Sequence, residues 1–332
     1  MSEKAKPEEE ISSLISQVKS IGYYAGLTFG AGYTLIFFGI IFIFVEMVLR
    51  ALQAGVLHYI GDLPPWRIIT LVFIFIGLFF GVVFGSTITG NAKSLKEDSL
   101  NLNKISSSAS VFSLMLLFLW LGSTISAFVN RQPSFSSVCG VAGTALFLIG
   151  LGRYREKASR FMGAIIMLIS LVLIYFAAYW NFLQRPVNGL LFSELTIEVV
   201  SLLILGICAA IFSLPIIQEE LKQTVFGLIL SIVGIVFSAG VIYLNFSALP
   251  AFSISTPIDQ IPYVNNLPGC SILLKSLSKF YISSVFAFSE AYSALIIFAG
   301  FLILGISGII GIITACLTLI IFMRQVTTGS KA

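Results

Sequence analysis

The chain has 332 residues, of which 58% are apolar and only 10% are charged, and its mean hydropathy is +1.02. An ordinary soluble domain carries about 25% charged residues, so the composition argues against one and predicts a polytopic membrane protein. One histidine and four cysteines are too few for a zinc, haem or iron–sulfur site within the chain. The net charge of +4 is spread over short connectors, which argues against nucleic-acid binding.

Eight segments are long and apolar enough to cross a bilayer as helices, which requires roughly 20 mostly apolar residues without charge. The sequence therefore predicts an all-α fold, a polytopic transmembrane helix bundle with eight spans. The spans are 23–47, 68–90, 105–129, 138–152, 161–182, 196–217, 224–245 and 292–323.

The distribution of Lys and Arg predicts the orientation of the bundle. With the N-terminus inside, thirteen of the 19 basic residues lie on the inner side and six on the outer side. Because cytoplasmic connectors retain Lys and Arg, both termini are predicted to be cytoplasmic, in a multi-pass protein integral to the cell membrane. The strongest local signal is the basic turn 153–160.

The last apolar run allows two interpretations. Residues 280–323 contain a single charge, Glu290, and as one helix they would measure about 66 Å, roughly twice the membrane core. Either only the part from Tyr292 onward crosses, or a tight hairpin near Gly300 makes nine spans. Arg324 and Lys331 favour the inner side for the C-terminus, and hence eight spans.

These spans divide the chain into five parts. An amphipathic N-terminal segment precedes the first span, and it is expected either to rest on the inner membrane surface or to dock a partner. A proline-rich cap with an interfacial helix precedes the last span. The parts are the cytoplasmic segment 1–21, seven transmembrane helices with short connectors over 22–246, the extracytoplasmic cap 247–291, the last helix 292–323 and the cytoplasmic tail 324–332.

The centres of the spans carry no charged side chain, although catalysis or ion coupling at depth requires ionisable groups. Hydroxyl groups at this depth are expected to bond back to their own helices, and they are those of Thr34, Ser170, Ser231, Ser238 and Thr314. No phosphate-binding loop occurs, so no nucleotide is expected. We therefore predict a protein that is not an enzyme, with no catalytic, cofactor-binding or metal-binding residues and no cofactor.

Three features near the span ends are candidate sites. Glu46 and Arg50 lie four residues apart at the outer end of the first span, as expected for an intrahelical ion pair. Glu290 is a candidate functional acid because it stands alone in its apolar run. Cys139 and Cys270 are both predicted on the outer, oxidising side and are a candidate disulfide.

Glycines recur at a spacing of four residues in the first two spans, which typically marks close helix packing or dimerisation. These faces, together with the lipid bilayer, are the predicted contact surfaces for a homo-oligomer or for other membrane subunits. The glycines are Gly22, Gly26, Gly30, Gly77, Gly81 and Gly85.

Two functions remain open at this point. The favoured one is a non-enzymatic scaffold or accessory subunit of a membrane complex, because no deep polar cluster is present. The alternative is a permease-like transporter of an uncharged or amphiphilic, lipid-like substrate without an intramembrane proton relay. A hydrated internal path would favour the transporter, and a solid bundle would favour the subunit.

Overall fold

Seven long α-helices make up the part of the chain that the structure describes. The computed structural model describes residues 5–53, 65–99, 102–129, 135–183, 224–249 and 287–329. The elements are α1 (Ala5–Gln53), α3 (Pro65–Lys96), α4 (Leu102–Val129), α5 (Phe135–Arg155), η1 (Lys157–Ser159, a 3-10 turn), α6 (Arg160–Leu183), α9 (Thr224–Ala248) and α12 (Ala287–Gly329). Over these residues the all-α class expected from the sequence is confirmed.

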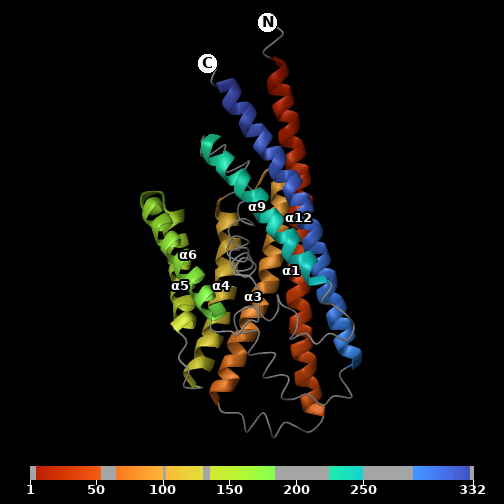
Figure 1. Ribbon diagram of the computed structural model, residues 1–332, viewed down its shortest axis with the longest axis vertical. Coiled ribbons are helices and arrows are strands. Elements are labelled where there is room, and N and C mark those ends of the chain that lie inside the picture. Colours follow the sequence, from red (N-terminus) through yellow and green to blue (C-terminus); the bar gives the residue numbers. More distant parts are fainter. Residues whose placement is uncertain are drawn as a thin grey trace.

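The main contacts between the helices form a single series, in the order α9, α12, α1, α3, α4, α5 and α6. From α1 to α6 this series follows the chain, and α12 then returns to pack on the other side of α1. The start of α1 and the end of α12 lie at the same end of the bundle (Figure 1). We call this end the terminal end.

Five helices, α1, α3, α4, α5 and α12, contain a segment long and apolar enough to cross a membrane. Two further helices carry shorter apolar stretches, Arg160–Ile174 in α6 and Ser231–Tyr243 in α9. The predicted sixth span, 196–217, lies outside the described residues. The helical, membrane-compatible character of the chain is therefore established, whereas eight spans and cytoplasmic termini stay predictions.

The last apolar run forms a continuous helix. α12 extends unbroken from Ala287 through Gly300 to Gly329, so the alternative of a hairpin near Gly300 is wrong. No proline or polar turn interrupts this stretch, and a glycine alone does not end a helix packed against a neighbour. Gly300 lies instead at a close contact, where an added Cβ would come within 2.9 Å of the Gly32 carbonyl oxygen on α1.

The amphipathic N-terminal segment is the first part of α1 and continues directly into the first span. Its apolar residue Val18 is only 1% exposed, and Ile11 and Leu14 are half-buried. The segment lies beside the end of α12, where the Glu10 carboxylate is 2.8 Å from the Arg324 guanidinium. The segment is thus continuous with the first span and packs beside α12, while its position relative to a membrane stays a prediction.

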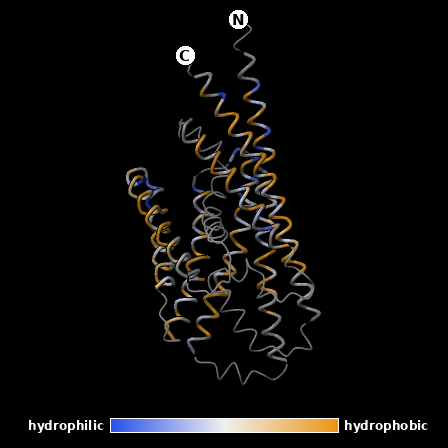
Figure 2. Tube along the Cα trace, in the orientation of Figure 1, coloured by the Kyte–Doolittle hydropathy of each residue, from blue (hydrophilic) through white to orange (hydrophobic). Residues whose placement is uncertain are grey.

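Apolar side chains cover much of the outer surface of the bundle, and the hydrophilic residues gather toward the terminal end (Figure 2). The helices at the two ends of the series show this best: Leu168 and Val172 on α6 are 63% and 67% exposed, and Val236 on α9 is 65% exposed. An apolar outer surface is what lipid-facing helices require, since lipid tails cannot solvate polar groups.

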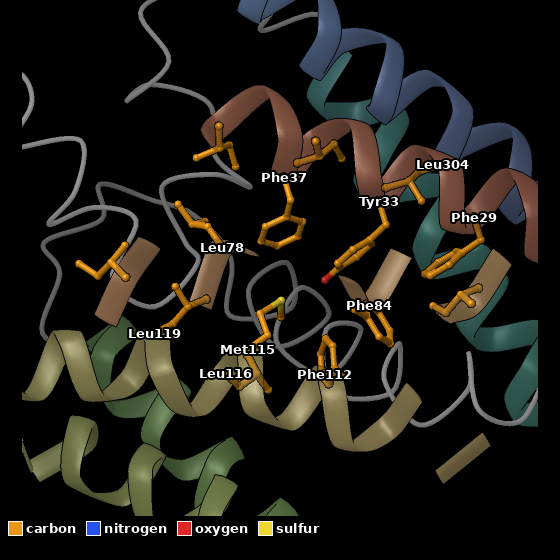
Figure 3. Close-up of a cluster of buried hydrophobic side chains, with 14 of the residues drawn as sticks. Phe29, Tyr33, Phe37, Leu78, Phe84, Phe112, Met115, Leu116, Leu119 and Leu304 are labelled. Atoms are coloured by element: carbon orange, nitrogen blue, oxygen red, sulfur yellow. The ribbon is translucent and has the colours of Figure 1, made fainter. Parts of the chain in front are cut away.

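The main core lies mostly between α1, α3 and α4, with Ile297, Phe301 and Leu304 of α12 on its other side, and it is built around aromatic rings (Figure 3). The ring of Tyr33 stacks on Phe37 at 5.0 Å and meets Phe84 edge-on at 5.1 Å. Phe84 in turn contacts Phe112 of α4 at 4.9 Å. These rings bury large surfaces and fix the relative positions of three helices, which gives the bundle a packed centre.

Candidate functional site: a basic, hydroxyl-rich terminal end

Polar side chains at the terminal end tie α3 to α4. The Asn91 side-chain amide donates to the Ser108 hydroxyl at 2.7 Å, and Asn91 Nδ2 lies 3.4 Å from the Lys104 carbonyl oxygen. The Lys104 ammonium donates to the hydroxyls of Ser94 at 2.8 Å and Ser99 at 3.2 Å. Ser94 and Ser108 are both buried, so the bonds that these two hydroxyls accept are largely shielded from solvent and hold the two helix ends in register, whereas the bond to Ser99 is exposed.

A second set of polar contacts ties α4 to α5. Arg155 Nε donates to the Ser106 hydroxyl at 2.6 Å, and Arg155 Nη2 lies 3.5 Å from the Ser110 hydroxyl. Both serines also donate to carbonyl oxygens of their own helix, that of Asn103 at 3.1 Å and that of Ser106 at 2.8 Å. With their protons so engaged, the serine oxygens present lone pairs to the guanidinium.

The spacing of these residues explains how one helix serves two neighbours. Lys104 and Ser108 are four residues apart and face α3, whereas Ser106 and Ser110 are four residues apart and face α5. Sequence reasoning did not identify these serines as a site. The signal was the run from Ser106 to Ser110, in which four of five residues are serines beside basic residues.

The turn between α5 and α6 is short and ordered by hydrogen bonds. The Ser159 hydroxyl lies 2.9 Å from the Arg153 carbonyl oxygen and 3.0 Å from the Glu156 carboxylate. The backbone N–H of Ser159 donates to the Glu156 carbonyl at 3.1 Å, and that of Glu156 donates to the Arg153 carbonyl at 3.2 Å. Arg160 begins α6 with its guanidinium 5.7 Å from the Tyr154 ring centre.

The end of α3 is linked to α1 by charges. The Lys19 ammonium lies 2.6 Å from the carboxylate of Asp98, which has a φ of 52° in the turn after α3. Two residues before Asp98, the Lys96 ammonium lies 5.1 Å from the ring centre of Tyr23, one turn after Lys19 on α1. The Asp98 side chain is 65% exposed, so this ion pair contributes little stability and mainly marks where the bundle meets water.

Serine hydroxyls together with the Lys104 ammonium and the Arg155 guanidinium therefore link the helices at the terminal end, and the carboxylates of Glu10, Asp98 and Glu156 lie at the same end. No group of three His, Cys, Asp or Glu side chains that could hold a metal ion occurs within the described ranges. Three of the hydroxyls predicted to bond back to their own helices do so: Thr34 donates to Gly30 at 2.8 Å, Ser170 to Met167 at 2.6 Å and Thr314 to Ile310 at 2.9 Å. For Ser238 the prediction is wrong, because its buried hydroxyl has no hydrogen-bond partner among the described residues.

The candidate residues near the other span ends stay predictions. Glu46 and Arg50 lie in the last turns of α1 and Glu290 in the first turn of α12, but their side chains are outside the described part of the structure. Cys139 is buried near the start of α5 at 8% exposure. Its proposed disulfide partner, Cys270, lies outside the described residues.

The glycines of the first span lie against α3. A Cβ added to Gly30 would come within 2.5 Å of the Gly85 carbonyl oxygen, and one added to Gly85 within 2.7 Å of the Gly30 carbonyl oxygen. A Cβ at Gly26 would meet Ala92 at 2.8 Å, and one at Gly22 would meet Leu95 at 3.1 Å. The backbones of α1 and α3 thus approach closely along this face.

The remaining predicted glycines receive larger side chains. A Cβ on Gly77 would meet the Leu119 side chain of α4 at 2.9 Å, and one on Gly81 would overlap the Phe37 ring of α1. These two glycines therefore make room for core residues of the neighbouring helices, including a ring of the aromatic cluster.

Two further close contacts were missed from the sequence. Gly32 of α1 and Gly300 of α12 face each other: a Cβ added to either glycine would lie 2.9 Å from the carbonyl oxygen of the other. Gly150 and Gly163 do the same between α5 and α6, at 3.0 and 2.7 Å. The signal was a spacing of seven residues, as between Gly32 and Gly39, which also keeps residues on one helix face.

Replacing Ser108 with alanine is expected to lower the stability of the bundle. The substitution removes the acceptor of the Asn91 side chain at a site with 0% exposure, and hydrogen bonds between helices in membranes contribute about 0.6 kcal/mol on average and up to about 1.7. Thermal unfolding in detergent, followed by tryptophan fluorescence, measures the effect. Ser107→Ala is the matched control because Ser107 is exposed; equal shifts for both variants would contradict the assignment.

Comparison of the chain with protein-family models, with curated proteins and with solved structures finds no match.

Proposed function

We propose that the chain is a non-enzymatic integral protein of the cell membrane, with both termini in the cytoplasm, that acts as a scaffold or accessory subunit of a membrane complex. The docking element is α12. Its partner is another transmembrane helix, supplied by a different subunit or by a second copy of the chain. The proposal depends on an apolar stripe of α12 that continues past the polar boundary of the bundle.

The stripe consists of exposed apolar residues at intervals of three and four from Leu302 to Met323, with Cys316 half-buried between Ile313 and Ile320, and Leu295 precedes Leu302 by seven residues. This spacing averages 3.5 residues, the period of helices that pack side by side with a left-handed crossing. Over the 29 residues from its first to its last member, the stripe extends about 42 Å along the helix. The exposed members are Leu295, Leu302, Ile306, Ile309, Ile313, Ile320 and Met323.

The α1–α12 projection, defined as residues 5–18 and 318–329, extends beyond the other helices at the terminal end (Figure 1). Lys19 pairs with Asp98 at the end of α3, so the preceding residues of α1 lie past that level and measure about 21 Å. α12 runs antiparallel to α1, with Thr314 beside Gly22.

The stripe continues onto this projection, which supports a protein partner over lipid alone. Ile320 and Met323 are 42% and 56% exposed and lie beyond the level of the Lys19–Asp98 pair, because the apolar stretch of α12, Leu295–Arg324, extends past the end of α3. A surface that only faces lipid is expected to become polar at that level, as the end of α3 does at Lys93 and Lys96. An apolar stripe that passes this boundary fits a partner helix that extends equally far.

The packed core is consistent with this role. The spans contain no Asp, Glu, Lys, Arg or His at their centres, and the centre of the described bundle is filled by aromatic rings. A partner-dependent subunit needs a rigid frame and an exposed contact surface, and it needs no relay of ionisable groups.

Substituting Ile320 and Met323 together by glutamine is expected to release the chain from its complex without unfolding it. The measurement is the mass of the native assembly in a mild detergent, by blue-native electrophoresis and light scattering. Ile232→Gln with Val236→Gln on α9 is the matched control, because these residues are also apolar and are 53% and 65% exposed.

A chain that is monomeric before and after substitution, and that alone moves a fluorescent phospholipid across proteoliposomes, would overturn the proposal in favour of a transporter. Loss of the assembly in both pairs of variants would show that any polar outward residue disrupts it, and would also count against α12 as the docking element.

A further inference from the structure

The α5–α6 turn, defined as residues 153–160, holds three arginines in fixed positions at the terminal end. The turn contains one acid whose side chain the structure describes, Glu156, and it is closed by the bonds of Ser159. An ordered turn of this length holds its guanidinium groups with a small loss of entropy on binding, unlike a free basic tail.

None of the three arginines is strongly neutralised by a carboxylate in the described part of the chain. Arg155 contacts the hydroxyls of Ser106 and Ser110. Arg153 lies 3.8 Å from Glu156, and both side chains are more than 60% exposed, which makes a weak pair. Arg160 stacks over Tyr154, and its buried Nε has no hydrogen-bond partner among the described residues.

An apolar surface begins immediately next to these charges. Phe161 and Met162, the first residues after Arg160, are 77% and 58% exposed. Phe161, Leu168 and Val172 lie on one side of α6 at intervals of seven and four residues. This arrangement complements an anionic phospholipid: the basic groups match its negative headgroup, and the adjacent apolar strip matches its acyl chains.

We propose that the α5–α6 turn is a binding site for an anionic phospholipid of the leaflet that faces the terminal end. The lipid phosphate accepts hydrogen bonds from the guanidinium groups of Arg153, Arg155 and Arg160, which suit phosphate because they donate in pairs. One acyl chain lies along Phe161, Leu168 and Val172. This lipid site depends on one part of the proposed function, the insertion of the chain in a membrane, and it requires no protein partner.

Charge complementarity and position support this occupant over a soluble anion. Each Lys or Arg near an anionic leaflet strengthens binding about fivefold, so three arginines select for anionic over zwitterionic lipid. A free phosphate or a headgroup without chains would use the same guanidinium groups but gain nothing from the exposed side chains on α6.

Native mass spectrometry of the full chain from mixed micelles of phosphatidylglycerol and phosphatidylcholine tests the site. The unmodified chain is expected to retain phosphatidylglycerol preferentially. Replacing Arg153, Arg155 and Arg160 by glutamine is expected to reduce that preference at least roughly tenfold. The matched control removes three charges elsewhere at the same end, with Lys93→Gln, Lys96→Gln and Arg324→Gln, and is expected to keep it.

Two additions keep the test decisive. Because Arg155 also bonds to Ser106, a variant with only Arg153→Gln and Arg160→Gln preserves that contact and guards against a folding defect. Competition with inorganic phosphate and with glycerophosphoglycerol separates lipid from free anion: displacement at equal concentration would overturn the lipid assignment. Equal retention of both lipids, or an equal loss in the control, would overturn the site, and neither result depends on whether a partner subunit binds α12.

Discussion

Alanine in place of Gly30 is expected to lower the melting temperature of the bundle, whereas alanine in place of Gly90 is expected to leave it unchanged or raise it slightly. At Gly30 the added Cβ would come within 2.5 Å of the Gly85 carbonyl oxygen and 2.9 Å of the Thr89 nitrogen. Both are backbone atoms of α3, so the clash can only be relieved by separating α1 from α3. At Gly90 no heavy atom lies within 4 Å.

The two substitutions make the same chemical change but are expected to have opposite effects on stability. Alanine is the better helix former by about 0.5–1 kcal/mol, which is the effect expected at Gly90. Overpacking costs about 1–3 kcal/mol and outweighs this gain at Gly30. Thermal unfolding in detergent and the monodisperse fraction on size exclusion measure both variants. A melting temperature that rises equally in both would mean that α1 and α3 do not approach as closely as described.

The position of α1 in the series bears on how the chain meets partners. Gly26 and Gly30 face α3, while Gly32 and Gly39 face α12, so close approach occurs on two sides of one helix. A partner that used the first of these ridges would have to displace α3 from within the same chain. This is why the proposed docking surface lies on α12 and not on the glycine face that the sequence first suggested.

The sequence predicts the helices well because length and apolar content alone decide whether a segment can span a membrane. Seven of the eight predicted spans coincide with described helices, including the long α12. Glycine spacing also located a close contact face, but it did not identify the neighbouring helix. The contact of Gly81 with the ring of Phe37 depends on the packing of two helices and has no local signal.

Polar contacts at the terminal end were less predictable. Ser106, Ser107 and Ser108 are consecutive and chemically identical, yet one accepts from Arg155, one is exposed and one accepts from Asn91. Only the rotation of α4 about its axis decides which serine meets which neighbour. In a membrane protein that rotation is poorly encoded, since the lipid-facing and the buried sides of a helix are both apolar.

Phenylalanines on α3 illustrate the same difficulty and supply the other large expected effect. Phe79 is 55% exposed and Phe84 is 0% exposed, although they are five residues apart in one apolar helix. Phe84 contacts Tyr33 of α1 and Phe112 of α4, at ring distances of 5.1 and 4.9 Å (Figure 3). It is therefore the ring through which three helices meet.

Replacing Phe84 with alanine is expected to destabilise the bundle by about 2–4 kcal/mol, near the lower part of the range for phenylalanine in soluble cores. Lipid is as apolar as the core, so the transfer of the side chain contributes little and the cost comes from the cavity and from lost ring contacts. Phe79→Ala, on the outer surface of the same helix, is the matched control and is expected to change stability by less than about 0.5 kcal/mol.

Reversible unfolding in a detergent titration gives both free energies, and tryptophan fluorescence reports the packing of the core because Trp120 of α4 belongs to the same hydrophobic cluster. Equal losses for Phe79 and Phe84 would place both rings in similar surroundings and contradict the rotation of α3. A loss confined to Phe84 would fix that rotation, and with it the sides of α3 that face α1 and α4, without reference to any partner or ligand.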